Sequence, residues 1–176
     1  MTVQAIVPSN QAREERDLLE VLYQAHYRRL LGLAAVMLRD RSAAEEAVQD
    51  AFVRVLRRGI AQRSDPILLG GYLRTVLINV VRTRLRRQQV ARRFKWDVSG
   101  AVPSAEEQAV LNEEQRGLTE ALRQLPLRQR ECLALRYYMD LSDREIAETL
   151  RISPSSVKTH MRRGLAALTK QVEVAP

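Results

Sequence analysis

Apolar residues recur at spacings of three and four through almost all of this 176-residue chain, and this periodicity limits its fold more than any other feature. Such spacing is typical of amphipathic helices, which turn once every 3.6 residues. Seven Gly and six Pro are too few breakers for a sheet-rich fold, and the 45% hydrophobic content is enough for a packed core. We therefore expect an all-α protein made of one ordinary domain or two small ones.

Capping and turn residues divide the first hundred residues into three predicted helices. The apolar spacing from Leu18 to Leu38 predicts one helix or a closely spaced pair. Ser42 and Glu45 have the spacing of a capping box and predict the start of a second helix, which Gly59 ends. Residues 59–71 are rich in turn formers and predict a loop, with one short helical turn after Pro66. The third predicted helix buries Leu73, Val76, Leu77, Val80, Val81 and Leu85.

Positive charge is concentrated in that third helix. The chain has 29 Lys and Arg against 21 Asp and Glu, a net charge of +8. Residues 1–100 carry 18 basic and 10 acidic side chains, whereas residues 101–176 carry 11 of each. Residues 72–95 include eight basic side chains and no acidic one. This distribution favours a polyanionic partner for the helix.

Several classes of protein are disfavoured by what the sequence lacks. It has no run of about 18 apolar residues and no signal-peptide pattern, so we expect a cytoplasmic protein without membrane insertion. His26 and His160 lie on separate predicted helices, and Cys132 is the single cysteine. We therefore expect no metal, no cofactor and no catalytic site. Cys132 is interpreted as a buried structural thiol, with a redox sensor as the alternative.

The last sixty residues predict a helix-turn-helix unit. A helix from about Arg128 to Tyr138 precedes Ser142 and Glu145, which form a second predicted capping box. The chain turns at residues 151–152, Ser153 caps the next helix, and Pro154 takes its first position. A short helix, a tight turn and a second helix are typical of units that place the second helix in the major groove of DNA.

The second helix of this unit has two chemically different sides. At 100° per residue, one side carries Val157, Met161, Gly164, Leu165 and Leu168. The other side carries Ser155, Lys158, Thr159, Arg162 and Arg163. Such donors can read guanine edges or hold phosphates, and the alternative interpretation is a solvated helix face.

Two groups of motifs resemble the extracytoplasmic-function (group IV) sigma factors of the bacterial sigma-70 family. Residues 125–131, followed by Leu141-Ser142, Glu145-Ile146-Ala147 and Val157-Lys158, resemble region 4 of that family. Residues 44–52 are similar to its region 2.2, and residues 72–87 are similar to regions 2.3 and 2.4. The resemblance covers about residues 15–95 and 112–170, in the order that the family has.

The resemblance implies a factor that binds RNA polymerase core and directs initiation at promoters. Region 2, over residues 15–95, would dock on the β′ clamp helices and open the −10 element of promoter DNA. Region 4, over residues 113–172, would meet the β flap and bind the −35 element. Residues 96–112 would be a flexible linker, with a leader over 1–14 and a tail over 173–176. The family also admits an anti-sigma factor as a partner.

The resemblance also assigns roles to individual residues. The core-binding set is Glu46, Gln49, Asp50 and Phe52, of which Phe52 would mainly pack. The −10 set is Tyr72, Arg74, Asn79, Arg82, Arg84, Arg86 and Arg87; Asn79 would pair with an unstacked base, and the arginines would hold phosphates. The −35 set is Ser155, Ser156, Lys158, Thr159, Arg162 and Arg163. Tyr72 stands where the family commonly has tryptophan.

A helix-turn-helix regulator that binds operators apart from polymerase is the nearest alternative. Its half-site binding would require a dimer, whereas a sigma factor acts as one copy per polymerase. The uninterrupted basic stretch beside an acidic helix in the N-terminal half favours the sigma factor.

Overall fold

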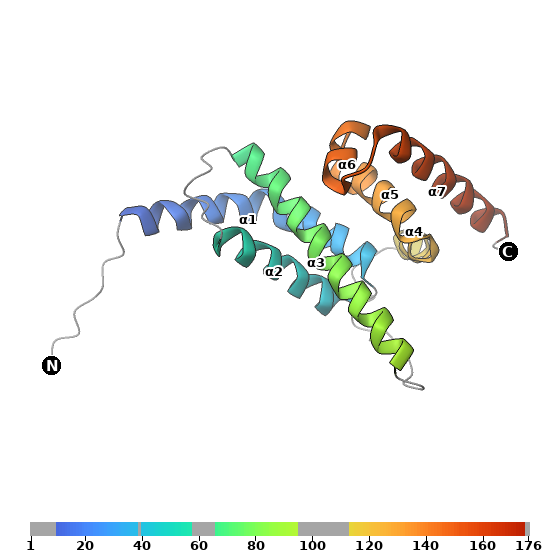
Figure 1. Ribbon diagram of the computed structural model, residues 1–176, viewed down its shortest axis with the longest axis horizontal. Helices are drawn as coiled ribbons and strands as arrows, with labels where there is room; N and C mark the ends of the chain where they lie inside the picture. Colours follow the sequence, from blue (N-terminus) through green and yellow to red (C-terminus); the bar gives the residue numbers. More distant parts are fainter. Residues whose placement is uncertain (1–9, 39, 58–65, 95–112, 175–176) are drawn as a thin grey trace.

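The computed structural model describes residues 10–38, 40–57, 66–94 and 113–174, and these residues form seven α-helices without a strand (Figure 1). The N-terminal half contains α1 (Asn10–Met37), α2 (Arg41–Arg57) and α3 (Pro66–Phe94). The C-terminal half contains α4 (Glu113–Gln124), α5 (Leu127–Met139), α6 (Asp143–Leu150) and α7 (Pro154–Val174). The all-α prediction is confirmed.

Only some of the predicted segment boundaries lie within the residues that the structure describes. The predicted linker over 96–112 lies outside the described residues, as do Gly59 and the first nine residues of the predicted leader. α1 starts at Asn10, inside the predicted leader, and continues as one helix rather than a closely spaced pair. Within the described ranges, no helix combines the length and the apolar character needed to cross a membrane.

α3 begins earlier than the sequence predicted. Its first residue is Pro66, so the short helical turn predicted after Pro66 is present, but it continues directly into the long helix instead of ending in a loop that reaches residue 71. Pro66 suits a first helical position, where its missing N–H costs nothing. Gly70 does not mark a turn, because it lies inside α3. A Cβ there would lie 2.7 Å from Nε2 of His26. The glycine instead lets α1 and α3 approach each other closely.

α2 is capped by Asp40, and the predicted capping box at Ser42 is wrong. The backbone N–H of Ser42 donates to Oδ1 of Asp40 at 2.9 Å, the bond that an N-cap residue makes to the second helical residue. Glu45 accepts from Nε of Arg41 at 3.1 Å. The helix therefore starts at Arg41, one residue before the predicted cap.

The local predictions for the C-terminal half are confirmed. The N–H of Ser142 donates to Oε2 of Glu145 at 2.8 Å, and the N–H of Glu145 donates to Oγ of Ser142 at 3.3 Å, which is a complete capping box. α6 ends at Leu150, and the C-cap residue Arg151, with a φ of 56°, turns the chain. Ser153 Oγ then accepts from the N–H of Ser156 at 3.1 Å as α7 begins. α6 and α7 form the helix-turn-helix.

The two halves lie against each other, and buried residues of both belong to one apolar core (Figure 1). α1 runs beside α5, and α3 meets α6. Arg123 donates to the carbonyls of Ala35 at 2.8 Å and Leu38 at 3.2 Å, and Arg130 donates to the carbonyl of Met37 at 3.1 Å. Carbonyls at the end of a helix have no partner within it, so the C-terminal half supplies donors to the end of α1.

Candidate nucleic-acid and polymerase interface

α7 is held to the rest of the C-terminal half by one narrow side. Val157 is fully buried, and Gly164 packs so closely on α5 that a Cβ there would lie 2.7 Å from Cδ1 of Leu133. Met161 and Leu168 are partly buried. Leu165 was predicted on this side, but it is 41% exposed, because its position lies about 80° around the helix from Val157.

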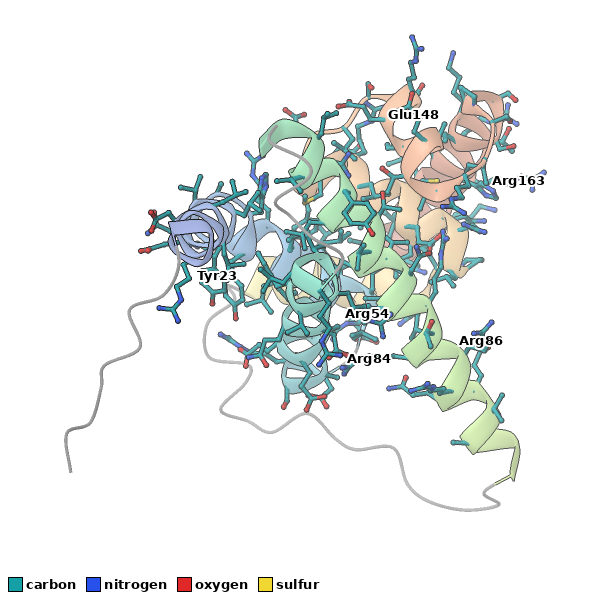
Figure 2. The ribbon with its side chains drawn as sticks, turned by 60° about the vertical axis from the view of Figure 1, so that its left-hand side comes forward. Tyr23, Arg54, Arg84, Arg86, Glu148 and Arg163 are labelled. Carbon is teal, nitrogen blue, oxygen red and sulfur yellow. The ribbon has the colours of Figure 1, made fainter. Side chains whose placement is uncertain are left out.

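The opposite side of α7 carries the predicted −35 residues. Ser155, Lys158, Arg162 and Arg163 are exposed, and Ser156 and Thr159 are partly exposed. Arg163 points away from the body of the protein (Figure 2). The hydroxyls of Ser155 and Ser156 each lie 2.8 Å from Oγ of Ser153, so they take part in the cap of the helix. Lys158, Arg162 and Arg163 are therefore the charged donors of this face.

Arg84 of α3 faces α2 rather than open solvent. Its guanidinium contacts Oε2 of Glu46 at 2.9 Å and Oδ2 of Asp50 at 2.8 Å, and it donates to the carbonyl of Ala43 at 3.3 Å. Burial lowers the pKa of Arg84, but the hydrogen bonds to the two carboxylates outweigh burial and raise it. Figure 2 shows Arg84 beside α2 and Arg86 on another side of α3. Arg84 thus joins the predicted core-binding helix to the predicted DNA-binding helix.

Arg82 is held by the other half of the chain. Its Nε lies 2.6 Å from Oε1 of Glu131, and its Nη2 lies 2.7 Å from Oε2, a bidentate pair. Glu131 is fully buried, and it also accepts from Nη1 of Arg128 at 3.1 Å.

Earlier on α3, Nε of Arg74 donates to Oγ1 of Thr149 of α6 at 3.3 Å. Burial lowers the pKa of Arg74.

The remaining −10 residues differ in exposure. Asn79, Arg86 and Arg87 are exposed, and Tyr72 is partly buried against the core. In the described part of the chain, no carboxylate forms an ion pair with Arg86 or Arg87. The structure therefore separates the predicted set into residues that face solvent and residues that already have protein partners.

Three of the four predicted core-binding residues, Glu46, Gln49 and Asp50, lie along one exposed part of α2. The side chains of Glu46 and Asp50 are 64% and 49% exposed, and Gln49 is exposed. Phe52 is only 6% exposed and lies beside Tyr23, with ring centroids 5.4 Å apart, so it packs. Each of the two carboxylates is bonded to Arg84 through one oxygen, and both remain exposed enough, together with the amide of Gln49, to meet basic groups of a partner as well.

Sequence reasoning missed Glu131 as the partner of Arg82. The signal was present, because at helical spacing Glu131 shares a side of α5 with Leu127, Ala134 and Leu135, and a buried carboxylate requires a partner. Cys132 beside it is buried, and burial raises the pKa of its thiol to about 11, so the thiol stays protonated at neutral pH. Among the residues described, no group of three or more His, Cys, Asp or Glu could hold a metal ion.

Two family models match the chain in sequence order. The sigma-70 region 2 model matches residues 22–90, and the model of sigma-70, region 4, matches residues 115–168. The ECF RNA polymerase sigma factor SigX of Bacillus subtilis is 30% identical over 165 residues, which are 90% of this chain and 85% of SigX. The ECF RNA polymerase sigma factor SigK of Mycobacterium ulcerans is 30% identical over 162 residues, covering 89% and 87% of the two chains.

Two solved structures share the fold over nearly the full length. The sigma factor RpoE, in complex with the anti-sigma factor NepR from Bartonella quintana, is 20% identical with a TM-score of 0.62 and covers 96% of this chain and 100% of its own. CnrH, in complex with the cytosolic domain of CnrY, is 19% identical with a TM-score of 0.66 and covers 94% and 96%. The chain belongs to the extracytoplasmic-function RNA polymerase sigma factors of the sigma-70 family and acts in promoter-specific transcription initiation.

Proposed function

We propose that the two halves divide the work of initiation between them. Region 2, over residues 15–95, docks on the β′ clamp helices of core polymerase and opens the −10 element. Region 4, over residues 113–172, meets the β flap and binds the −35 element, with residues 96–112 as the linker. The observation that carries this proposal is the exposed, donor-rich side of α7, which a capped helix-turn-helix presents to solvent.

The chemistry of α7 supports major-groove binding. Lys158 and Arg162 lie about one turn apart on the same side, where they can reach base edges or phosphates together. Arg163 projects beside them, and Ser155, Ser156 and Thr159 lie at the N-terminal end of the helix. Residues near the N-terminus of a recognition helix are the ones that contact base edges.

The chemistry of α3 supports contact with a melted strand. Arg86 and Arg87 can hold phosphates without reading sequence, and Asn79 can pair with a base that has left the stack. Glu46, Gln49 and Asp50 are proposed to bind basic groups of the clamp helices, with Phe52 packing beneath them. Tyr72, Arg74, Arg82 and Arg84 complete the proposed −10 set.

Further partners and the place of action follow from the same proposal. We propose that the chain acts in the cytoplasm and is not an enzyme, because the chemistry of RNA synthesis belongs to polymerase. RpoE was solved in complex with the anti-sigma factor NepR, and we propose a partner of this kind for the chain.

The decisive experiment is promoter-directed transcription with purified components. The chain would be added to sigma-free bacterial core polymerase on a pool of genomic fragments, and the RNA 5′ ends would be sequenced. New start sites that share two spaced upstream elements are the expected result. DNA binding without core-dependent initiation, under conditions where a control sigma factor works, would replace this proposal with an operator-binding regulator.

A further inference from the structure

We propose that Arg151, in the turn of the helix-turn-helix, holds a phosphate of the promoter duplex beside the −35 element. The inference rests on the proposed binding of region 4 to that element. Arg151 lies outside the −35 set that the sequence resemblance assigned, and it would add affinity for DNA without reading sequence.

The backbone conformation of Arg151 is unusual for an arginine. Its φ of 56° and ψ of 51° are left-handed, and the N–H of Ile152 donates to the carbonyl of Ala147 at 3.0 Å, which closes the end of α6. Glycine is the usual residue in this arrangement, because without a Cβ it avoids the steric penalty that other residues meet. Arginine therefore leaves the end of α6 strained where glycine would not. Strain that persists at one residue points to a role for its side chain.

A second left-handed residue shows why the arginine needs an explanation. Among the described residues, Asp140 and Arg151 are the two residues other than glycine that have a positive φ. Asp140 follows α5 with a φ of 55° and a ψ of 41°. Aspartate is enriched in this conformation, since its short polar side chain can hydrogen-bond the nearby backbone. The chemistry of Asp140 accounts for its position, whereas the long side chain of Arg151 brings no such compensation.

The side chain of Arg151 is exposed, and within the described ranges no carboxylate forms an ion pair with it. Glu148 lies one helical turn earlier on α6, but it pairs with Arg144 at 3.5 Å. A guanidinium is always charged in proteins. Arg151 therefore presents a positive charge to solvent that no acidic side chain of this surface neutralises.

Arg151 also lies next to the end of α7 that faces DNA in the proposed function. It comes two residues before Ser153, whose Oγ accepts from the N–H of Ser156 and caps the N-terminal end of α7. In helix-turn-helix proteins the first helix crosses the DNA backbone, and the N-terminal residues of the second helix contact base edges. The turn between them consequently passes the rim of the groove, where phosphates lie. Arginine suits this place, because its planar fork matches the oxygens of a phosphate.

The test uses the full-length chain and −35 duplexes taken from a promoter mapped by the transcription experiment, with a scrambled duplex beside them. Arg151→Gly removes the guanidinium, so we expect about 8-fold weaker binding in about 0.1 M salt, as measured by fluorescence anisotropy. The slope of log K against log salt should flatten by about 0.9, the value for one phosphate contact on duplex DNA. The loss should be the same on every duplex, and a loss confined to particular base pairs would contradict a phosphate contact.

Stability should change in the opposite direction to affinity. Glycine relieves the left-handed backbone, so Arg151→Gly should raise the Tm by about 2 °C. Arg151→Gln keeps the strained backbone and removes only the charge, so it should lose the same affinity while its Tm stays within about 1 °C of the unmodified chain. An arginine that served only the structure of the turn could not give weaker DNA binding together with higher stability.

Two further variants control for the backbone and for net charge. Asp140→Gly makes the same backbone change in the turn before α6, and it should leave the salt slope unchanged because it removes no cation. Arg54→Gln removes an exposed arginine of α2 (Figure 2), and it should change −35 binding by less than about 2-fold because salt screens distant charges.

The outcomes distinguish this inference from the proposed function. If the unmodified chain fails to direct initiation with core polymerase, the proposed function fails and the inference falls with it. If the chain initiates but Arg151→Gly and Arg151→Gln leave duplex affinity and salt slope unchanged, the phosphate contact alone is wrong. Weaker binding to core polymerase in place of DNA would assign the guanidinium to a protein partner and overturn the inference. A lower Tm in both variants together with weaker DNA binding would also overturn it, because Arg151 would then serve the structure of the turn.

Discussion

The two proposed DNA-binding helices carry similar side chains but present them in opposite ways. On α7, Lys158, Arg162 and Arg163 are exposed along one open side. On α3, Arg82 and Arg84 are engaged by carboxylates. Counting basic residues along the sequence therefore overstates the positive charge that α3 offers to DNA in the free chain, and it describes α7 more faithfully.

The difference comes from how many neighbours each helix has. α7 packs on α5 and α6 within its own half, so most of its circumference stays open. α3 packs against α1 and α2 and also meets α6 of the other half. A helix enclosed on several sides brings its arginines against acceptors of those neighbours, since a partly buried cation needs a partner. Accessibility on α3 thus depends on tertiary contacts, whereas on α7 it depends mainly on local ones.

Displacing α7 from α5 should have the largest effect on stability and DNA binding. The position of its exposed side depends on the close packing of α7 against α5. Gly164→Leu would force a side chain into the space of Leu133, where even a Cβ would lie 2.7 Å away. We expect a loss of about 3 kcal/mol in the free energy of unfolding, the upper part of the range for overpacking. Binding to a −35 duplex should disappear, as measured by fluorescence anisotropy alongside urea denaturation.

A second helical glycine provides the control for that change. A Cβ added to Gly117 of α4 would point into open space among the described residues, so Gly117→Ala meets no steric resistance. It should stabilise the chain by up to about 1 kcal/mol, because alanine is the better helix former. Equal destabilisation by the two variants would mean that close packing under α7 is not what holds its DNA side in place.

Arg162→Ala tests whether the open side of α7 reads sequence. If Arg162 contacts a base edge, binding to the −35 element should weaken by about 1–3 kcal/mol, and the loss should depend on the base pair replaced. The measurement is anisotropy with a panel of single-substitution duplexes, taken from a promoter mapped by the transcription experiment. Equal losses on every duplex would reassign Arg162 to phosphate binding.

On α3 we expect the exposed arginines of the free chain to contribute more to DNA binding than the arginines already engaged by carboxylates. Replacing both Arg86 and Arg87 with Ala removes two exposed cations, so single-stranded DNA binding should weaken about 25-fold in about 0.1 M salt, with a slope flatter by about 1.4. Arg84→Ala should change both far less, because Glu46 and Asp50 already occupy its guanidinium. A loss from Arg84→Ala as large as that from the pair would contradict the division between engaged and exposed arginines.

Local signals in the sequence were sufficient to predict the helix caps and the turn of the C-terminal half. The capping box at Ser142, the turn at Arg151 and the cap at Ser153 all lie within a few residues of their partners, and the structure confirms them. The predicted α3 start was wrong for a different reason. Gly70 looked like a turn former, but its role is to admit His26 from α1, a residue far away in the sequence. Only the tertiary fold could reveal that.

The state of the candidate site was harder to predict than its composition. The arginines of α3 were identified from spacing and charge, yet their partners come from sequence positions far away, as with Arg82 and Glu131, 49 residues apart. Ion pairs between exposed or partly exposed groups leave little trace in a single sequence. A buried glutamate within an apolar stripe is the exception, and it could have flagged the contact between the halves.

The smallest expected effect concerns the capping box at the start of α6, between Ser142 and Glu145. Hydrogen bonds from Ser142 lower the pKa of Glu145 below its ordinary value of 4.5, so this contribution to stability is complete above that pH and is lost as the pH falls through the lowered pKa. Ser142→Ala should therefore cost about 1 kcal/mol at about pH 7 and less at about pH 3.5, as measured by urea denaturation. Thr169→Ala, which removes an exposed hydroxyl from α7, should change stability by less than about 0.5 kcal/mol at either pH. If the cost of Ser142→Ala does not change with pH, the carboxylate of Glu145 contributes nothing to the cap. The whole effect would then come from the bond between the N–H of Glu145 and the hydroxyl of Ser142, because that bond does not titrate.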